Sequence, residues 1–219
     1  MKSTVKLHVW GDYACFTRPD LKVERVSYDC ITPSAACGVL QAIHWKPAIR
    51  WVVDKIHVLK PIRFQSIQTN EIKSKASPQA ARRAMASGDA SLMRNEVSSD
   101  RTQRSSLVLR DVAYVIEAHF EMTAQAGPSD NPGKHADIFL RRARKGQCFK
   151  QPCLGLRDYS AAFELVDNAP VSELAGTERE LGLMLYEFDY DKRLPAFFRA
   201  RMKDGVLDIA AARKEGLLR

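Results

Sequence analysis

The sequence predicts an α+β fold, and the order of its expected elements carries this prediction. In residues 1–146, segments that alternate apolar and polar residues, as strands do, are interrupted by two segments of helical character. Their order is strand, helix, strand, strand, helix. Residues 147–219 contain mainly strand-like segments. Antiparallel pairing in this order fits a ferredoxin-like (RRM-type) domain at 1–146, followed by a small antiparallel β-sheet domain at 147–219.

The first strand and the first helix have clear local signals. Residues 4–11 alternate at period two and end in Gly-Asp, which predicts a strand. Thr32 is placed to cap a helix that starts with Pro33 in its first turn. We expect this helix to run to Trp45, because Pro47 disfavours helical backbone just before it.

The second strand is expected at residues 48–59, which are rich in β-branched residues. Its apolar positions change parity around Asp54 and Lys55, and this indicates a β-bulge. Pro61 turns the chain into residues 62–72, the expected antiparallel partner of the second strand.

Residues 74–106 differ from the rest, because they are rich in Ala, Ser and Arg and have almost no large apolar residues. Such a segment buries little surface, so it is predicted to be a mobile or loosely helical insertion. Residues 106–124 then restore a long strand with one apolar face. A helix after residue 131 follows, and further strands are expected at 153–166, 181–190 and 195–209.

The composition is that of a globular protein with an anionic partner. Hydrophobic residues make up 45% of the chain, charged residues 27%, and the formal net charge is +8, which favours partners such as nucleic acid. Apolar runs are too short to span a bilayer and no signal-peptide core is present, so a cytoplasmic protein without membrane contact is expected. The 5 cysteines are irregularly spaced, which predicts reduced thiols and no metal site.

The segment "DNPGKHADIFLRRARKG" combines turn chemistry with a basic helix. Asn131 can cap this helix, and Pro132 suits its first turn. Lys134 and His135 then fall where free backbone N–H groups and the helix dipole favour an anion. The same field disfavours imidazolium, so His135 is expected to stay neutral and to accept a proton.

The same helix is expected to pack on one side and to present a basic stripe on the other. Ala136, Phe139 and Ala143 form its apolar face at helical spacing. The charge pattern alone favours another interpretation, a solvated basic face with an incidental histidine. The basic stripe consists of Lys134, Arg141, Arg144 and Lys145.

The other histidines have simpler interpretations. His44 ends the first predicted helix, where an interaction with the helix dipole is the simplest role. Trp45 and Lys46 beside it could stack on a base and hold a phosphate, although a tryptophan is commonly a core residue. Histidines in predicted strands are expected to be structural. These are His8, His57 and His119.

Several families of enzymes are excluded by missing motifs. The chain has no Walker loop, no dinucleotide-binding glycine pattern, no H-E-x-x-H zinc motif and no nucleophile elbow. Its carboxylates are scattered along the sequence. Phosphodiester chemistry in this chain would therefore rely on lysine and histidine without a metal.

The chain from Gly11 to Pro61 strongly resembles the type I-C (Dvulg subtype) CRISPR-associated family-five protein, the processing endoribonuclease of that system. Residues 104–123, residues 133–159 and the C-terminal strands resemble it as well. The resemblance covers nearly the whole chain, and residues 74–106 are its weakest part.

This resemblance implies a ferredoxin-like N-terminal domain, a small C-terminal β-sheet domain, and cleavage of the CRISPR repeat stem-loop without metal or cofactor. The product stays bound by its 5′ handle in the interference complex. The family's active site includes a Lys-His pair, matched by Lys134 and His135. It also includes a tyrosine before a W-K-P motif, where this sequence has His44. Tyrosine and histidine differ in pKa by several units, so their roles need not be equivalent.

The expected mechanism uses the RNA 2′-hydroxyl as nucleophile, with Lys134 stabilising phosphoryl charge and His135 and His44 sharing the acid and base work in an undecided order. The expected partners are the precursor hairpin, the mature guide RNA and other complex subunits, with duplex DNA as a further ligand. Two alternatives are a non-catalytic subunit that grips the handle and a general nucleic-acid-binding module. The expected RNA contacts are Trp45, Lys46, Arg141, Arg142, Arg144 and Lys145, with Arg82 and Arg83 as weaker candidates.

Overall fold

The fold was analysed on a computed structural model that describes residues 4–21, 23–189 and 192–218. The chain divides into two compact units. The first comprises residues up to Gln65 together with those from Leu107 onwards, and the second comprises Ser66–Ser106. The domain boundary predicted between residues 146 and 147 therefore lies inside the first unit.

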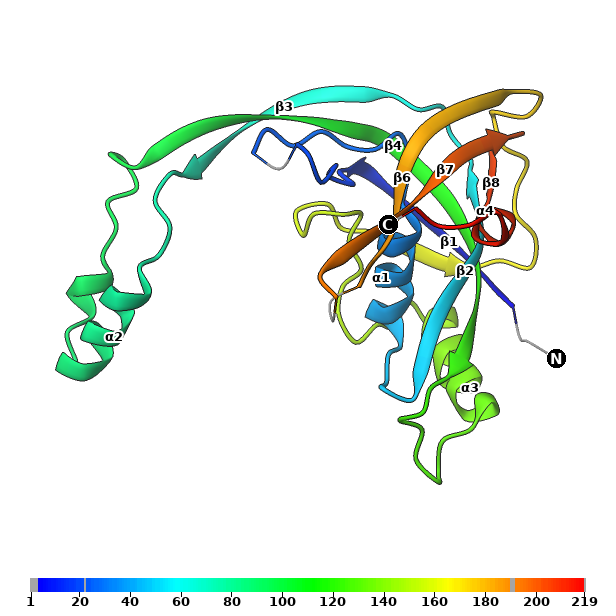
Figure 1. The fold of residues 1–219 in the computed structure, drawn as a ribbon, viewed down its shortest axis with the longest axis horizontal. Coiled ribbons are helices and arrows are strands. Elements are labelled where there is room, and N and C mark those ends of the chain that lie inside the picture. Colours follow the sequence, from blue (N-terminus) through cyan, green and yellow to red (C-terminus); the bar gives the residue numbers. More distant parts are fainter. Residues whose placement is uncertain (1–3, 22, 190–191, 219) are drawn as a thin grey trace. The chain divides into compact units, whose positions relative to one another are not determined.

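The described chain is α+β, with one mostly antiparallel sheet of eight strands and few helices (Figure 1). None of the helices within the described ranges is long and apolar enough to cross a membrane. In chain order the elements are β1 (Val5–Ala14), α1 (Pro33–Ile43), β2 (Ile49–Val58), β3 (Phe64–Ile72), α2 (Pro78–Ser87), the 3-10 helix η1 (Ala90–Met93), β4 (Arg101–Met122), α3 (Pro132–Arg144), β5 (Ala162–Leu165), β6 (Glu178–Asp189), β7 (Leu194–Lys203), β8 (Val206–Asp208) and α4 (Ile209–Glu215).

Strand β4 is an interior strand of the sheet, because it pairs antiparallel with β1 on one side and with β2 on the other. The strand order is β5-β1-β4-β2-β8-β7-β6. The C-terminal strands thus continue the same sheet through the pairing of β8 with β2. Strand β3 pairs with β4 and not, as expected from the sequence, with β2.

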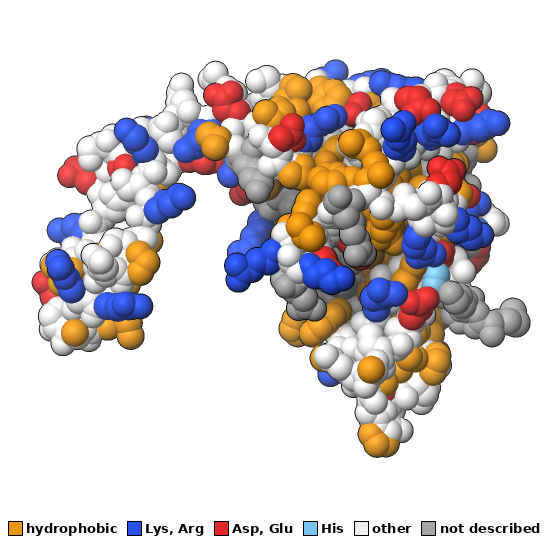
Figure 2. All heavy atoms as spheres, viewed as in Figure 1, with side chains coloured by type: hydrophobic (Ala, Val, Ile, Leu, Met, Phe, Trp, Pro, Cys, Tyr) orange, Lys and Arg blue, Asp and Glu red, His pale blue; other side chains and the backbone are white. Residues whose placement is uncertain are grey.

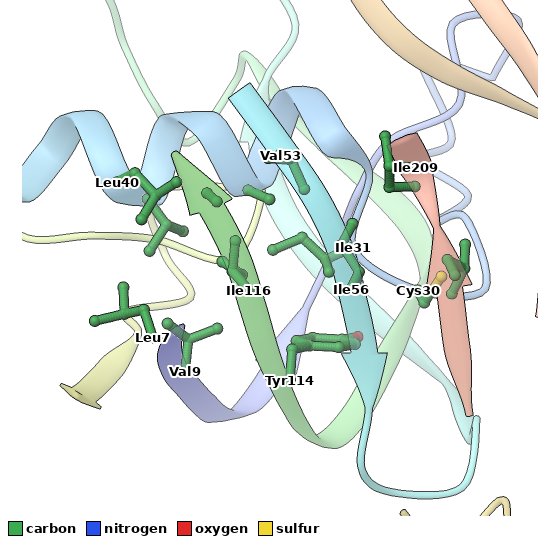
Figure 3. Close-up of a cluster of buried hydrophobic side chains, with 14 of the residues drawn as sticks. Leu7, Val9, Cys30, Ile31, Leu40, Val53, Ile56, Tyr114, Ile116 and Ile209 are labelled. Carbon is green, nitrogen blue, oxygen red and sulfur yellow. The ribbon is translucent and has the colours of Figure 1, made fainter. Parts of the chain in front are cut away.

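The predicted bulge in the second strand is confirmed. The register of β2 against β4 shifts between Val53 and Lys55, which allows Trp51 and Ile56 to be buried on either side of the parity change. Ile56 and Ile116, partners across the two strands, are both fully buried. Figure 3 shows them within one apolar cluster that also receives side chains from β1 and α1.

Helix α1 begins as predicted, with the Thr32 side chain accepting a hydrogen bond from the Ala35 N–H. It ends at Ile43, two residues earlier than expected. One later strand prediction was also longer than the strand that forms. Only Ala162–Leu165 of the strand predicted at 153–166 is a β-strand, since the preceding residues form turns and a single bridge. Tyr190, the last residue of another predicted strand, lies outside the described residues.

The second unit contains the segment that the sequence singled out, and it is more ordered than expected. Helix α2 is capped by Ser77, and none of its residues is buried. An ion pair of 3.1 Å joins Arg104 to Glu71, which connects β4 to β3. Figure 2 shows Lys and Arg side chains spaced along this unit, and the side chains of Arg82 and Arg83 are exposed.

Gly155 provides a test of how the loop before β5 docks on the end of β1. Its φ is +89°, and a Cβ there would lie 1.9 Å from the Cys15 carbonyl oxygen. Gly155→Ala should therefore lower the free energy of unfolding by about 3 kcal/mol, because strain and a backbone clash add. Gly176→Ala is the matched control, since its φ is +76° without a neighbour within 4 Å. It should lose only about 1 kcal/mol in urea unfolding, and equal losses would contradict the docking argument.

Candidate active site

The start of α3 forms as its sequence predicts. Asn131 is extended at the N-cap, and its side chain accepts a 2.9 Å hydrogen bond from the Lys134 N–H. Pro132 follows in the first turn. The cap fixes the direction in which the next two side chains, Lys134 and His135, leave the helix.

His135 belongs to the buried face of α3, which was not foreseen. Its side chain is 1% exposed, and it shares this face with Phe139 and Ala143 at intervals of four residues. Ala136, which the sequence assigned to the apolar face, is only half-buried. His135 also meets the Phe120 ring edge-on, with ring centroids 6.4 Å apart. The alternative interpretation of His135 as an incidental histidine on a solvated face is therefore wrong, because the ring lies in the core.

His44 is the C-cap of α1, and both its backbone N–H and its carbonyl group make hydrogen bonds. Its N–H donates to the Leu40 carbonyl at 3.0 Å, and its own carbonyl accepts from the Trp51 indole N–H at 2.9 Å. Its side chain is 2% exposed. Nε2 of His44 lies 3.1 Å from Nδ1 of His135, and the two rings stack with an interplanar angle of 28°. The structure thus brings together two residues that lie 91 positions apart.

Sheet register explains why the two histidines meet. Ile49 at the start of β2 pairs with Met122 at the end of β4. The loop that leads from α1 into β2 and the loop that leads from β4 to α3 therefore lie side by side at the same end of these strands. The Thr123 N–H donates to the Ala48 carbonyl at 2.9 Å and continues this pairing. His44 and His135 stand at the two ends of these joined loops.

The pKa of His44 is lowered to about 4, first by burial and then by the nearby His135, Arg142 and Lys46 in that order of importance. His44 is therefore neutral near pH 7. A neutral imidazole has one N–H donor and one lone-pair acceptor, so the pair can share a single hydrogen bond without burying a charge.

Lys134 is on the exposed side of the same turn. Its Nζ lies 3.2 Å from Oδ1 of Asp130 and donates to the Ser129 carbonyl at 3.2 Å. The pKa of Asp130 is lowered, first by the Gly127 N–H that donates to it and then by Lys134. Sequence analysis missed Asp130, although its spacing of four residues before Lys134 was a usable signal.

The predicted RNA-binding residues fall into two groups. Trp45 is 54% exposed, so it is not a core residue, and Lys46 beside it is exposed. Arg142 is half-buried and donates from Nη1 to the Ile43 carbonyl at 2.8 Å, which ties α3 to the end of α1. The remaining members of the basic helix are exposed, namely Arg141, Arg144 and Lys145.

The three strand histidines each have a carboxylate partner. His8 lies 3.0 Å from Glu164, His57 lies 2.8 Å from Glu117, and His119 lies 2.7 Å from Asp54. The 5 cysteines are unpaired. Across the described ranges, no group of three or more His, Cys, Asp or Glu side chains is arranged to hold a metal ion.

Comparison with known sequences identifies the family. The sequence model of a family described as CRISPR-associated protein (Cas5), of the Cas5d type, matches residues 4–209. The chain belongs to this family. A protein of Mannheimia succiniciproducens named "CRISPR pre-crRNA endoribonuclease Cas5d" is 54% identical over 215 residues, covering 95% of this chain and 96% of that protein. A protein of the same name from Thermus thermophilus is 35% identical over 235 residues, covering 98% and 95%.

Solved structures agree on the fold. A crystal structure described as that of a CRISPR-associated protein has a TM-score of 0.72 at 23% identity, covering 100% of this chain and 97% of that one. The protein SMU1763c from Streptococcus mutans, described as functionally uncharacterized, has a TM-score of 0.69 at 21% identity, with coverage of 100% and 98%. At these identities the likeness establishes the fold and nothing about activity.

The buried histidine pair predicts a pH dependence of stability. The pKa of His44 is about 4 in the folded chain, below the ordinary 6.5 of a histidine in an unfolded chain, so the unfolded chain takes up this proton first. The contribution of His44 to stability is complete above about pH 6.5 and is lost as the pH falls towards 4. His44→Gln, which does not titrate, should flatten the fall in unfolding free energy across this interval. Equal slopes for both proteins in urea titrations would contradict the lowered pKa.

Proposed function

We propose that this chain is an endoribonuclease that cuts the repeat hairpin of precursor CRISPR RNA. The observation that carries the proposal is the meeting of His44 with the Lys134-His135 pair at the start of α3. The two named relatives support it, because both are called pre-crRNA endoribonucleases and align with nearly the whole chain.

The chemistry needs three contributions. The RNA supplies its own nucleophile, the 2′-hydroxyl beside the scissile phosphate. A base removes the hydroxyl proton, a cation stabilises charge on the phosphoryl oxygens, and an acid protonates the leaving 5′-oxygen. The products are a 2′,3′-cyclic phosphate and a 5′-hydroxyl, and these steps require no metal or cofactor.

Lys134 and His135 supply these contributions. Lys134 is the exposed cation and stabilises the phosphoryl charge. His135 carries the acid and base work through Nε2, because Nδ1 is occupied by the bond to His44. In this arrangement His44 accepts from Nδ1–H of His135 and leaves the Nε2 lone pair available. His44 therefore completes the catalytic group by holding His135.

This role accounts for the departure from the family's tyrosine. A phenol and a neutral imidazole can each donate and accept one hydrogen bond. His44 stays neutral because its pKa is near 4, so it can take the place of a hydroxyl towards Nδ1 of His135. The substitution preserves a hydrogen-bonding function and need not preserve a proton-transfer function.

The RNA is proposed to run across the exposed face beside this site. Trp45 offers an exposed ring on which a base can stack, and Lys46 lies next to it. Arg142 contributes charge, although its hydrogen bond to Ile43 gives it a structural role as well. Phosphate contacts along α3 come from Arg141, Arg144 and Lys145.

The proposal extends to the organisation of the chain and its partners. We assign residues 1–146 to a ferredoxin-like domain and residues 147–219 to a small β-rich domain that shares its sheet. After cleavage the chain stays on the 5′ handle of the guide RNA as a cytoplasmic subunit of the type I-C interference complex. Contacts to phosphates also permit duplex DNA as a ligand.

The enzyme can be separated from a subunit that only binds the handle. Incubated with a repeat hairpin and excess chelator, the protein should cut at one position, and a 2′-deoxy substitution at the scissile nucleotide should abolish cutting. Gel analysis of 5′-labelled RNA measures this. Binding without any cutting would support the non-catalytic alternative.

The catalytic assignment predicts slow variants that still bind RNA. Lys134→Ala should lower the single-turnover rate by about 10²- to 10³-fold. His135→Ala should lower it by about 10²- to 10⁴-fold. Lys203→Ala, an exposed lysine of β7, is a control for the loss of one positive charge. Rates equal to that of the control would remove Lys134 and His135 from the mechanism.

The exposed ring of Trp45 predicts a change in affinity instead. Trp45→Ala should weaken binding of the 2′-deoxy hairpin by about 5- to 150-fold, the range for loss of one stacked base. Trp45→Phe should retain most of the affinity because an aromatic ring remains. Unchanged binding of Trp45→Ala in filter-binding assays would place the RNA elsewhere.

A further inference from the structure

Asp130 stands directly in front of the two proposed catalytic groups. Its Oδ1 lies 3.2 Å from Nζ of Lys134 and 3.2 Å from Nε2 of His135. This single oxygen therefore touches both groups at the N-terminal end of α3, a helix of 13 residues.

The contact with His135 is close without being a hydrogen bond. Nε2 of His135 has no hydrogen-bond partner among the described residues, and the side chain is only 1% exposed. A buried ring nitrogen without a partner is costly, and such atoms commonly mark places where a ligand binds. Oδ1 of Asp130 lies 3.2 Å from this nitrogen.

Asp130 does not have the geometry of a residue that orients His135. An orienting carboxylate accepts a proton from the ring nitrogen that faces away from the substrate, and in this site that nitrogen is held by His44 at 3.1 Å. Asp130 instead faces the nitrogen assigned to the chemistry. Its other oxygen, Oδ2, accepts from the Gly127 N–H at 3.1 Å, so the loop before α3 holds it in place.

We propose that Oδ1 of Asp130 occupies the seat of a non-bridging oxygen of the scissile phosphate, and that the RNA displaces this carboxylate when it binds. The inference rests on the function proposed above and adds to it the position of the reacting phosphate. Both groups are monoanions with two terminal oxygens, so the phosphate can take over the contact with Lys134, and the neighbouring 2′-hydroxyl can then donate to the Nε2 lone pair of His135.

Displacement is favoured by the weakness of what holds Asp130. Its ion pair joins two partly exposed side chains, whose attraction is reduced by solvent. A phosphodiester brings its charge to the same lysine, together with the remaining contacts of the RNA. In the free protein, the Asp130 carboxylate thus occupies the proposed phosphate position, and the RNA has to displace it.

Asp130→Asn tests the proposal, because asparagine keeps the shape and can still accept from the Gly127 N–H. We expect this variant to bind a repeat hairpin with a 2′-deoxy scissile nucleotide about fivefold more tightly than the unaltered protein. Asp137→Asn is the matched control, since it removes the same charge from an exposed position of α3. The control should gain clearly less affinity.

Single-turnover cleavage of the natural hairpin provides the second measurement. Asp130→Asn should cut at least as fast as the unaltered protein when RNA is saturating. Affinity no greater than that of Asp137→Asn would overturn the proposal, and so would a loss of rate beyond about tenfold with binding intact. If Asp130→Asn does not fold, as judged by circular dichroism, Asp130→Ala is measured in the same way against the same criteria.

Failure of the proposal and failure of the proposed function are distinguishable. The affinity comparison uses an RNA that cannot be cut, so it remains valid whether or not the protein cleaves. An unaltered protein that binds but never cuts the natural hairpin refutes the nuclease. Equal affinities of Asp130→Asn and Asp137→Asn refute only the position assigned to the phosphate.

Discussion

The antiparallel pairing of β4 with both β1 and β2 is the constraint on which the rest of the first unit depends. It makes β4 an interior strand of the sheet and buries Tyr114 and Ile116 in the main apolar cluster. The register of β4 against β2 also determines which loops leave the sheet together. Because the register pairs the start of β2 with the end of β4, the end of α1 and the start of α3 meet at that end of the two strands. The site is therefore a consequence of strand register.

Where α1 and α3 meet, burial decides the charge that a side chain can carry. Two imidazole rings that lie in the core cannot both be charged without a large desolvation cost. His44 avoids this cost by remaining neutral, with its Nε2 3.1 Å from Nδ1 of His135, while the positive charge of Lys134 remains at the surface. In the proposed mechanism this arrangement leaves Nε2 of His135 to carry the acid and base work beside an exposed cation.

The second unit, Ser66–Ser106, is stabilised differently from the first. Helix α2 has a clear cap and a glycine in left-handed conformation at its C-cap, yet it buries none of its residues. Local hydrogen bonds such as those from Asn95 and Ser74 to Asp100 stabilise its turns. Its order thus comes from capping and strand pairing, which a count of large apolar residues does not detect. This is why the sequence predicted a loosely helical insertion and missed the extension of β4 down to Arg101.

The sequence by itself determined the α+β class, the start of α1 at Thr32, the bulge after Val53 and the cap of α3 at Asn131. Each of these depends on neighbours within a few residues, so local pattern and propensity suffice. Only the tertiary structure decided that His135 is buried and that its partner is His44. It alone placed Asp130 against Lys134 and His135, the proposed catalytic groups. These contacts arise from strand register and from the packing of α3, and neither leaves a signal in local sequence.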